Sequence, residues 1–550
     1  MRCRVSAVSP FHSMTDITNF NDNGAAGHQD PEIAPIKGKA TPEMTTAFRD
    51  RHEDYSQTFK TLGLTGLQCS PVGFGTYRVD VRVPTHRGSL AKALRMGVNL
   101  IDTSANYADG MSERLVGEVL RGMTLHDLVR REEIIIVSKG GYLQGENFER
   151  MRARVESPGA DLSAGSELAE LTKYGKGLWH SIHPDFLKDQ ITRSLERLQL
   201  ETIDVYLLHN PEYYIQHAIK ESIPEDEARD EYERRIRQAF AYLEEEVKLG
   251  RIQYYGISSN TFPRAEESLD RTSLEAAWKH AEAVKKEKGL EAHHFAVIQL
   301  PLNIFEPQGV TEQNQLRATM STIDFAREHN IGVLVNRPLN AIVGQRLHRL
   351  ADFPAREHPE QDDINELVHD LALQENEFKD EMLEKIDIAE QSADAVKSLL
   401  ALGKWLEGQW MNFNSFEEWK DISTTILAPR VQYVFDILRP VAKENQPVFE
   451  FLSTYAESAD EVMEHINNYY SAQANERAAK IHTAIDALIP GDYKELSLSQ
   501  KAVLLIRSIE GVSSVLVGMR TEEYVDDVVY GLQAKPIEDV EKVWQRMVVS

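Results

Sequence analysis

Short apolar runs recur along the chain from residue 58 onward, and most of them are rich in β-branched residues. In EIIIVS (133–138) and IDVYLL (203–208), apolar side chains follow one another instead of alternating with polar ones. Continuous runs of this kind are typical of parallel strands that are covered on both faces. The predicted strands are 98–101, 133–138, 203–208, 252–257, 296–300, 332–336 and 512–517, after a hairpin and a first strand within 58–78.

Segments with apolar residues at helical spacing lie between these strands. The predicted helices are 87–96, 112–121, 184–198, 235–249, 272–288, 315–329 and 499–509. Strand and helix alternate about eight times, and the simplest closed arrangement is a (β/α)8 TIM barrel, an α/β fold. An open doubly wound sheet is the alternative. It is disfavoured because no Gly-x-Gly-x-x-Gly follows the first strand and no phosphate-loop motif is present.

One long segment, residues 347–496, interrupts the alternation with helical patterns alone. It is long enough to bury a small core of its own. We therefore predict a barrel over residues 56–346 and 497–550, with a mostly helical insertion at 347–496. Because strand-to-helix loops lie on the catalytic face of a barrel, the insertion should emerge there, after the seventh strand. It could close over the pocket as a lid, or it could be a peripheral interaction domain.

The first 55 residues are polar and show no periodicity. MRCRVSAVSPFH, at the start, has two Arg, two Ser and no acid, so it faintly resembles an organellar transit peptide. Acidic residues follow soon after, which favours a disordered tail instead. We expect a cytoplasmic protein, with an organellar location as the alternative.

Charge and composition exclude several classes of function. The 550-residue chain has a formal net charge of −26, which argues against nucleic acid and anionic membranes as partners. It contains two cysteines, too few for a disulfide scaffold, and no apolar run approaches the roughly 20 residues of a membrane helix. The 18 histidines are scattered, so we predict no metal site.

Four polar residues stand at or just after the ends of apolar strands. Asp102 ends one strand, Tyr107 lies in the loop after it, Lys139 ends the next strand and His209 ends the one after that. In a barrel all four would face one mouth, and Lys139 could pair with Asp102 because their strands are neighbours in chain order. Each residue alone could instead serve packing, capping or solvation, so the prediction depends on their combination.

This combination suits the protonation of an oxyanion as a hydride reaches carbon. A tyrosine is ordinarily too weak an acid, with a pKa of about 10. We expect the charge of Lys139 to lower the pKa of Tyr107 toward working pH, with Asp102 holding the lysine in place. His209 could orient a carbonyl oxygen against the phenol.

The same segments resemble the aldo-keto reductase family. The likeness covers GFGTYR, GVNLIDTSANYADGMSERLVGEVL, VSKGG and DVYLLHNPE, and extends over about 58–346 and 497–529. The resemblance implies that the family's Asp, Tyr, Lys and His tetrad corresponds to Asp102, Tyr107, Lys139 and His209. It also implies an NAD(P)(H)-dependent oxidoreductase that acts on an aldehyde, a ketone or a sugar.

The cofactor-binding half of the family pattern continues along the chain. Ser258 and Gln299 match residues that hold the nicotinamide carboxamide, and the role of the family's Asn falls to Ser259 by register or Asn260 by type. Asn336 stands where many members have a stacking Tyr. The resemblance implies these cofactor-binding positions: Gly75, Thr76, Ser258, Ser259, Asn260, Gln299, Asn336, Arg337, Pro338, Leu339, Gly518, Arg520, Thr521 and Asp527.

Two further expectations concern the cofactor and the partners. Arg520 and Thr521, at a predicted helix start, would suit a 2′-phosphate, so NADP(H) is favoured over NAD(H). Some barrels of this family serve as nucleotide-sensing regulatory subunits. In that alternative the insertion would bind a protein partner, but the intact tetrad favours turnover.

Overall fold

A computed structural model describes residues 34–343, 346–353 and 358–549. The contacts within it divide the chain into two compact units. One unit comprises residues 30–345 and 485–550, and the other contains residues 346–484. All residues of the predicted site fall in the first unit.

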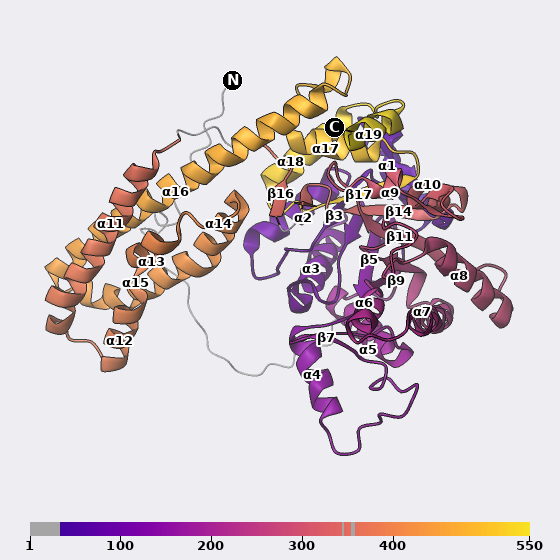
Figure 1. Ribbon diagram of the computed structural model, residues 1–550, viewed down its shortest axis with the longest axis horizontal. Coiled ribbons are helices and arrows are strands. Elements are labelled where there is room, and N and C mark those ends of the chain that lie inside the picture. Colours follow the sequence, from indigo (N-terminus) through magenta and orange to yellow (C-terminus); the bar gives the residue numbers. More distant parts are fainter. Residues whose placement is uncertain (1–33, 344–345, 354–357, 550) are drawn as a thin grey trace. The chain divides into compact units, whose positions relative to one another are not determined.

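The first unit is built on a closed barrel of eight parallel strands (Figure 1). In barrel order these are β3 (Val72–Gly75), β4 (Leu100–Asp102), β5 (Ile135–Gly140), β9 (Ile203–His209), β10 (Ile252–Ser258), β11 (Phe295–Pro301), β14 (Gly332–Asn336) and β17 (Val512–Val517), which pairs with β3. Every residue of β5, β9 and β11 is buried, as expected of strands covered on both faces. The predicted TIM barrel is confirmed.

Helices surround the strands in the order that the pattern predicts. They are α2 (Pro84–Arg95), α3 (Met111–Leu125), α5 (Pro184–Leu198), α7 (Glu225–Lys248), α8 (Leu274–Lys288), α10 (Thr322–Glu328), α17 (Leu498–Arg507), α18 (Glu522–Tyr530) and α19 (Val540–Val549). One prediction was wrong: 315–329 is not a single helix. Residues 316–318 adopt positive φ in a hairpin between β12 (Gln313–Gln315) and β13 (Met320–Ser321), and α10 begins only after it.

The segment before the barrel is more ordered than its polar sequence suggests. Within the stretch predicted as a tail, α1 (Pro42–Asp50) forms with Thr41 as its N-cap and buries Phe48. The sequence signal was weak because a nine-residue helix presents so few apolar positions. The hairpin β1 (Lys60–Thr61) and β2 (Gln68–Cys69) follows as predicted. Residues 1–33, where the transit-peptide resemblance falls, lie outside the described residues.

Two smaller excursions extend the strand-to-helix loops of the barrel. After β5 come β6 (Tyr142–Leu143), α4 (Gly145–Val155), β7 (Thr172–Gly175) and β8 (Leu178–His180), and after β9 comes α6 (Tyr213–Lys220). The three short strands pair as an antiparallel sheet in the order β6, β8, β7. Leu143, Met151 and Phe186 belong to a local core, so this excursion is a packed substructure rather than an open loop.

A buried ion pair joins the amino-terminal segment to the barrel. Arg131 donates to Asp204 at 2.9 Å and to the carbonyl oxygens of Ile134 and Thr202. Asp204 also accepts from the backbone N–H groups of Ala40 and Ile136, so its charge is satisfied from several sides.

We expect Arg131→Met to lower the free energy of unfolding by about 3–5 kcal/mol, because it leaves the buried Asp204 carboxylate without its counter-ion. Arg152→Met is the matched control. It breaks an exposed pair with Glu149, and it should cost less than about 1 kcal/mol. Chemical denaturation measures both, and equal losses would contradict the assignment of Arg131 to the buried network.

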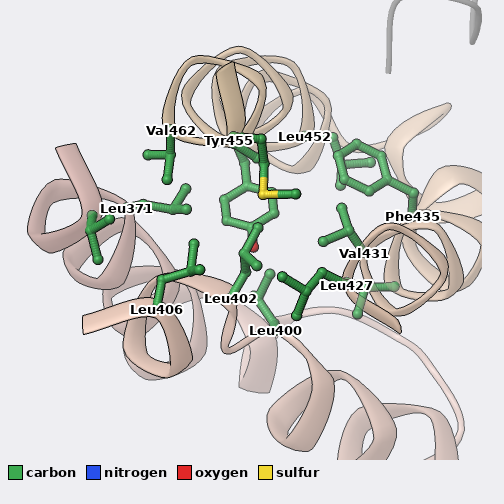
Figure 2. Close-up of a cluster of buried hydrophobic side chains, with 14 of the residues drawn as sticks. Leu371, Leu400, Leu402, Leu406, Leu427, Val431, Phe435, Leu452, Tyr455 and Val462 are labelled. Carbon is green, nitrogen blue, oxygen red and sulfur yellow. The ribbon is translucent and has the colours of Figure 1, made fainter. Parts of the chain in front are cut away.

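The second unit is helical and has its own apolar core (Figure 2). It contains α11 (Gln361–Glu377), α12 (Glu390–Leu399), α13 (Leu402–Gln409), α14 (Phe416–Ile422), α15 (Ala428–Ala442) and most of α16 (Gln446–Asp486). Leu371, Leu406 and Tyr455 meet in that core, and the Tyr455 hydroxyl donates to the buried Glu375 at 2.8 Å. The mostly helical region between the seventh barrel strand and its helix is confirmed. The short strands β15 (Asn340–Val343) and β16 (Arg346–Arg349) at its start were not predicted.

Candidate active site

The four tetrad residues come from three neighbouring strands at the carboxyl end of the barrel. Asp102 is the last residue of β4, Lys139 lies near the end of β5, and His209 ends β9. Tyr107 begins a short 3-10 turn in the loop after β4. Because parallel strands end at the same mouth, residues distant in sequence come together here.

Lys139 is the centre of the site. Its side chain is fully buried, and its ammonium group donates to Asp102 Oδ2 at 2.8 Å and to the Tyr107 hydroxyl at 3.1 Å. The carbonyl oxygen of Thr103 accepts the third hydrogen bond at 3.0 Å. All three ammonium donors are therefore used, and the lysine is fixed directly beside the phenol.

The charge state of Tyr107 differs from the expectation. Burial raises the pKa of Tyr107 above its ordinary value, and the nearby Asp102 carboxylate adds to that effect. Lys139 lowers the pKa but does not outweigh the burial. The expected net lowering of the Tyr107 pKa was therefore wrong, because the sequence does not show how far the fold removes the half-buried Tyr107 from water. Tyr107 carries its proton at neutral pH, as a proton donor must.

Lys139 stays charged despite its burial. Loss of water would lower the pKa of Lys139, but the charge of Asp102 and the hydrogen bonds to Asp102 and Tyr107 raise it above its ordinary value. The site thus contains a permanent cation beside a neutral phenol. Any negative charge that develops near the Tyr107 oxygen would be stabilised by that cation.

His209 is held in its neutral form. Burial and the positive charge of Lys139 keep the pKa of His209 well below its ordinary value. Its ring lies edge-on to Tyr107, with the centroids 6.0 Å apart, and its Nδ1 atom is 3.1 Å from the Ser104 hydroxyl. A neutral imidazole in this position can orient an oxygen atom, and it does not compete with Tyr107 as a proton source.

The loop that carries Tyr107 is strained and braced. Ala108 and Asp109 both adopt positive φ (47° and 54°), which side chains other than glycine rarely accept. Asp109 accepts a hydrogen bond from the backbone of Glu146, in the excursion after β5. Strain of this kind persists only where surrounding contacts hold it, and it is common at functional sites.

Several aromatic residues around the tetrad were not predicted. Tyr77, which is 67% exposed, lies edge-on to Tyr107 at 5.3 Å, and Tyr142 lies edge-on to His209 at 4.7 Å. Tyr213 stacks on His180. The sequence did carry a signal for two of them, because Tyr77 lies in GFGTYR and Tyr213 follows His209 by four residues.

Gln299 links the tetrad to the predicted cofactor positions. Its amide nitrogen donates to Asp102 Oδ1 at 2.8 Å, and its amide oxygen accepts from Ser258 at 3.1 Å and from Asn336 at 3.3 Å. The structure thus brings Ser258, Gln299 and Asn336 together beside Asp102. The resemblance implies that Ser258 and Gln299 hold the nicotinamide carboxamide and that Asn336 stands at the position of a stacking Tyr, and both remain predictions.

Ser259 and Asn260 make contacts of a different kind. The Ser259 hydroxyl is buried and hydrogen-bonded to Thr261 and Thr272, so it serves an internal network. Asn260 is exposed, and its backbone N–H donates to Glu212 at 2.9 Å. Glu212 was missed by the sequence analysis. Burial raises its pKa to about 7.

Unpartnered polar atoms test whether these residues suit a cofactor. Thr76 Oγ1, Asn336 Oδ1 and Arg337 Nε are all buried atoms without a protein hydrogen-bond partner. Arg337 also adopts positive φ (54°) and pairs with Glu306 at 3.0 Å. Buried polar groups are normally satisfied, so these atoms fit a polar ligand at the ends of β3 and β14. Of the neighbours, Gly75 ends β3, Pro338 follows Arg337 and Leu339 is buried.

The second predicted cofactor segment follows β17. Gly518 is exposed, Arg520 is partly exposed, and Thr521 is the N-cap of α18. A cation beside a helix N-terminus suits a phosphate group. Asp527 is occupied differently: its two carboxylate oxygens accept from Ser497 at 3.0 Å and Ser499 at 2.5 Å, at the start of α17.

No group of three or more His, Cys, Asp or Glu side chains among the described residues is arranged to hold a metal ion. None of their helices is long and apolar enough to cross a membrane.

Comparison with known proteins now adds to this geometry. The model of the Aldo/keto reductase family matches residues 71–544. The chain belongs to the aldo/keto reductase family. The match includes all four tetrad residues, and the family membership inferred from the motifs is confirmed.

Individual proteins similar to this chain have low sequence identity to it, and the matches cover only parts of their length. The NADH-specific methylglyoxal reductase of Escherichia coli is 26% identical over 27% of this chain and 40% of its own. The L-galactose dehydrogenase of Arabidopsis thaliana is 27% identical over 30% and 42%. The NAD(P)H-dependent D-xylose reductase of Scheffersomyces stipitis is 25% identical over 48% and 73%. The chain therefore spans less than half the length of the first two relatives.

Among solved structures, one match is the glycerol dehydrogenase AKR11B4 from Gluconobacter oxydans. It is 16% identical, covers 89% of this chain and 94% of its own, and has a TM-score of 0.42.

Proposed function

We propose that this aldo/keto reductase family member is an NAD(P)(H)-dependent oxidoreductase that interconverts a carbonyl group and an alcohol. The observation that carries the proposal is the contact of a buried, charged Lys139 with both Asp102 and the Tyr107 hydroxyl. The cation stabilises negative charge on an oxygen beside Tyr107, and Tyr107 holds a proton that it can give to that oxygen.

Each residue has a separate task in this proposal. A bound nicotinamide would supply or accept the hydride, held by Ser258, Gln299 and Asn336. Tyr107 transfers the proton through its hydroxyl, and Lys139 stabilises the charge that this transfer leaves on the phenol oxygen. His209, kept neutral, orients the substrate oxygen toward Tyr107.

The direct test is a spectrophotometric assay. Purified protein is mixed with NADPH or NADH and a panel of aldehydes, ketones and sugars, and the loss of nicotinamide absorbance is followed. Turnover supports the proposal, and the comparison of the two nucleotides identifies the cofactor. Cofactor binding without turnover on any carbonyl would instead support the regulatory alternative.

The raised pKa of Tyr107 predicts the pH profile. As a proton donor, Tyr107 is active below its pKa, and activity is lost as the pH rises through it. Because burial raises this pKa above about 10, kcat for carbonyl reduction at saturating cofactor should stay level from about pH 6 to 9 and fall only above about 10. A falling limb near pH 7 to 8 in kcat, with cofactor still saturating, would contradict this assignment.

NADP(H) is our proposed cofactor, in preference to NAD(H). Arg520 is partly exposed beside Thr521, the N-cap of α18, where it could meet a 2′-phosphate. The relatives include both an NADH-specific and an NAD(P)H-dependent enzyme, so the preference depends on Arg520.

Small aldehydes and sugars are the substrates that we propose. The relatives named above are a methylglyoxal reductase, an L-galactose dehydrogenase and a D-xylose reductase. Around the tetrad, Tyr77 and Tyr142 offer aromatic faces and edges together with hydroxyl groups. Such amphipathic side chains suit polyhydroxylated molecules of modest size.

The helical unit follows β14 along the chain, within a strand-to-helix connection, and connections of this kind often control substrate choice in barrels. We therefore propose that the helical unit takes part in substrate selection. We expect a chain in which residues 346–484, the helical unit, are replaced by a short linker to accept bulkier carbonyl substrates. The specificity profile over the substrate panel measures this. An unchanged profile would favour the other role, in which the unit binds a protein partner.

A further inference from the structure

A chain of three polar side chains leads away from His209. The Ser104 Oγ atom is 3.1 Å from His209 Nδ1 and 2.7 Å from Asn106 Oδ1. Asn106 in turn donates through Nδ2 to Gln144 Oε1 at 3.1 Å. Ser104 and Asn106 lie in the Tyr107 loop, and Gln144 lies in the excursion after β5, so the chain connects that excursion to the tetrad.

The Ser104 hydroxyl has a single proton and three possible acceptors, which are Asn106 Oδ1, His209 Nδ1 and, at 3.4 Å, the carbonyl oxygen of Lys139. If the proton goes to the Lys139 carbonyl oxygen, His209 must donate to Ser104, as it does when Asn106 accepts. When the proton goes to Asn106 Oδ1, the Ser104 oxygen must accept from His209, so Nδ1 carries the imidazole proton and Nε2 is a bare acceptor. When Ser104 donates to His209 Nδ1, the imidazole proton is on Nε2. Whether Ser104 donates to His209 or accepts from it thus decides the tautomer of the imidazole ring.

The donors and acceptors in this series of hydrogen bonds can exchange roles while the side chains stay in place. Rotating the Asn106 amide by half a turn exchanges its oxygen and nitrogen, so that Nδ2 donates to Ser104 and Oδ1 faces Gln144. Gln144 has an amide as well and can supply the matching donor. Every hydrogen bond in the chain is then kept, with the opposite polarity.

We propose that Ser104 and Asn106 are positioning residues that set the tautomer of His209, and through it the oxygen that the site can hold. A carbonyl oxygen only accepts hydrogen bonds, so it requires a proton on Nε2. An alcohol hydroxyl can donate, so it is also held by a bare Nε2. This inference deepens the proposed function and rests on it.

The surroundings of His209 leave the tautomer as its main variable. The ring is buried, and the charge of Lys139 keeps it neutral. Tyr142 packs edge-on against it, and His180 Nε2 donates to the backbone carbonyl oxygen of His209 at 2.8 Å. With both the charge and the ring position fixed, the remaining choice is which nitrogen carries the proton.

Asn106→Asp tests the proposal with almost no change of shape. A carboxylate only accepts, so it draws the Ser104 proton permanently and places the imidazole proton on Nδ1. The arrangement in the structure also has the proton on Nδ1, and a carbonyl substrate needs the reversed polarity, which Asn106→Asp prevents. We therefore expect kcat for carbonyl reduction to fall about tenfold or more, with cofactor affinity unchanged. The KM of the carbonyl should rise relative to the inhibition constant of the matching alcohol.

Nitrogen NMR of the full chain, labelled with [15N]histidine, reports the tautomer without turnover. His209→Asn assigns the signals. In Asn106→Asp, Nδ1 of His209 should become the protonated nitrogen. In Ser104→Ala the two nitrogens should change their ratio from wild type, whereas Ser104→Thr, which keeps a hydroxyl, should restore the wild-type signature. Ser70→Ala, which removes a buried hydroxyl at the other end of the barrel, is the control and should leave the signals unchanged.

The outcomes separate this inference from the proposed function. Identical His209 signals in wild type, Asn106→Asp and Ser104→Ala would overturn it, whether or not the protein turns over. A shifted tautomer with unchanged kcat and KM would overturn the link to substrate binding. Wild-type protein that reduces no carbonyl would refute the proposed function, while the NMR comparison would still decide whether the chain sets the tautomer.

Discussion

Tyr107→Phe should lower kcat for carbonyl reduction by about 10²- to 10⁴-fold and leave cofactor affinity nearly unchanged. The phenol is the group that contacts Lys139 Nζ at 3.1 Å and carries its proton at neutral pH. Phenylalanine keeps the ring, and with it the edge-on packing against Tyr77 and His209. The change therefore removes a proton donor and little else.

Two measurements make this result specific. Cofactor titration by fluorescence should give the same dissociation constant for wild type and Tyr107→Phe, because none of the predicted cofactor contacts uses the phenol. Tyr77→Phe is the matched control: it removes an exposed hydroxyl from the neighbouring ring, which could change the KM of a sugar, but it should change kcat by less than about threefold because this hydroxyl supplies no proton. A Tyr107→Phe enzyme that reduces aldehydes at the wild-type rate would show that another group supplies the proton.

The pattern of the sequence was sufficient to predict the barrel and to nominate the tetrad, for a physical reason. Parallel strands buried on both faces read as continuous apolar runs, so a polar residue at the end of such a run stands out. Asp102, Lys139 and His209 were recognisable in this way, because a charge beside a buried strand requires a partner. Their convergence then follows from the topology of a closed parallel barrel.

The features that the sequence did not reveal depend on how the folded protein buries individual side chains. The sign of the Tyr107 pKa shift is decided by the competition between burial and Lys139, and only the folded loop shows that burial prevails. Glu212 reads as one more acid in an acidic chain, yet it is buried against the backbone of Asn260. The hydrogen bonds of Ser104 could not be predicted from the sequence either, because they depend on its contact with His209 in the folded protein.

Local backbone geometry accounts for the misassigned elements. The run predicted as one helix over 315–329 has good helical spacing, but Leu316 and Arg317 adopt positive φ and turn the chain back into a hairpin. Nothing in these side chains signals that conformation, which residues other than glycine seldom adopt. The hydrophobic pattern of the sequence predicts helices and strands that bury a long apolar face. It does not predict short elements whose conformation is determined by turns and caps.

Lys139→Met is the second change with a large expected effect, and it separates chemistry from stability. Removing the cation takes away the group that stabilises charge on the Tyr107 oxygen, so kcat should fall by about 10²- to 10³-fold. It also leaves Asp102 as a buried carboxylate without its counter-ion, with a hydrogen bond from the amide of Gln299 still in place. We therefore expect a loss of about 3–5 kcal/mol in the free energy of unfolding.

The double variant Lys139→Met with Asp102→Asn divides these two effects. Neutralising Asp102 removes the uncompensated charge, so most of the lost stability should return, as measured by chemical denaturation. Activity should not return, because no cation remains beside Tyr107. If the double variant recovered kcat together with stability, Lys139 would have only a structural role. If it recovered stability alone, the buried cation would be required for the chemistry at Tyr107, and Asp102 would act by holding that cation in place.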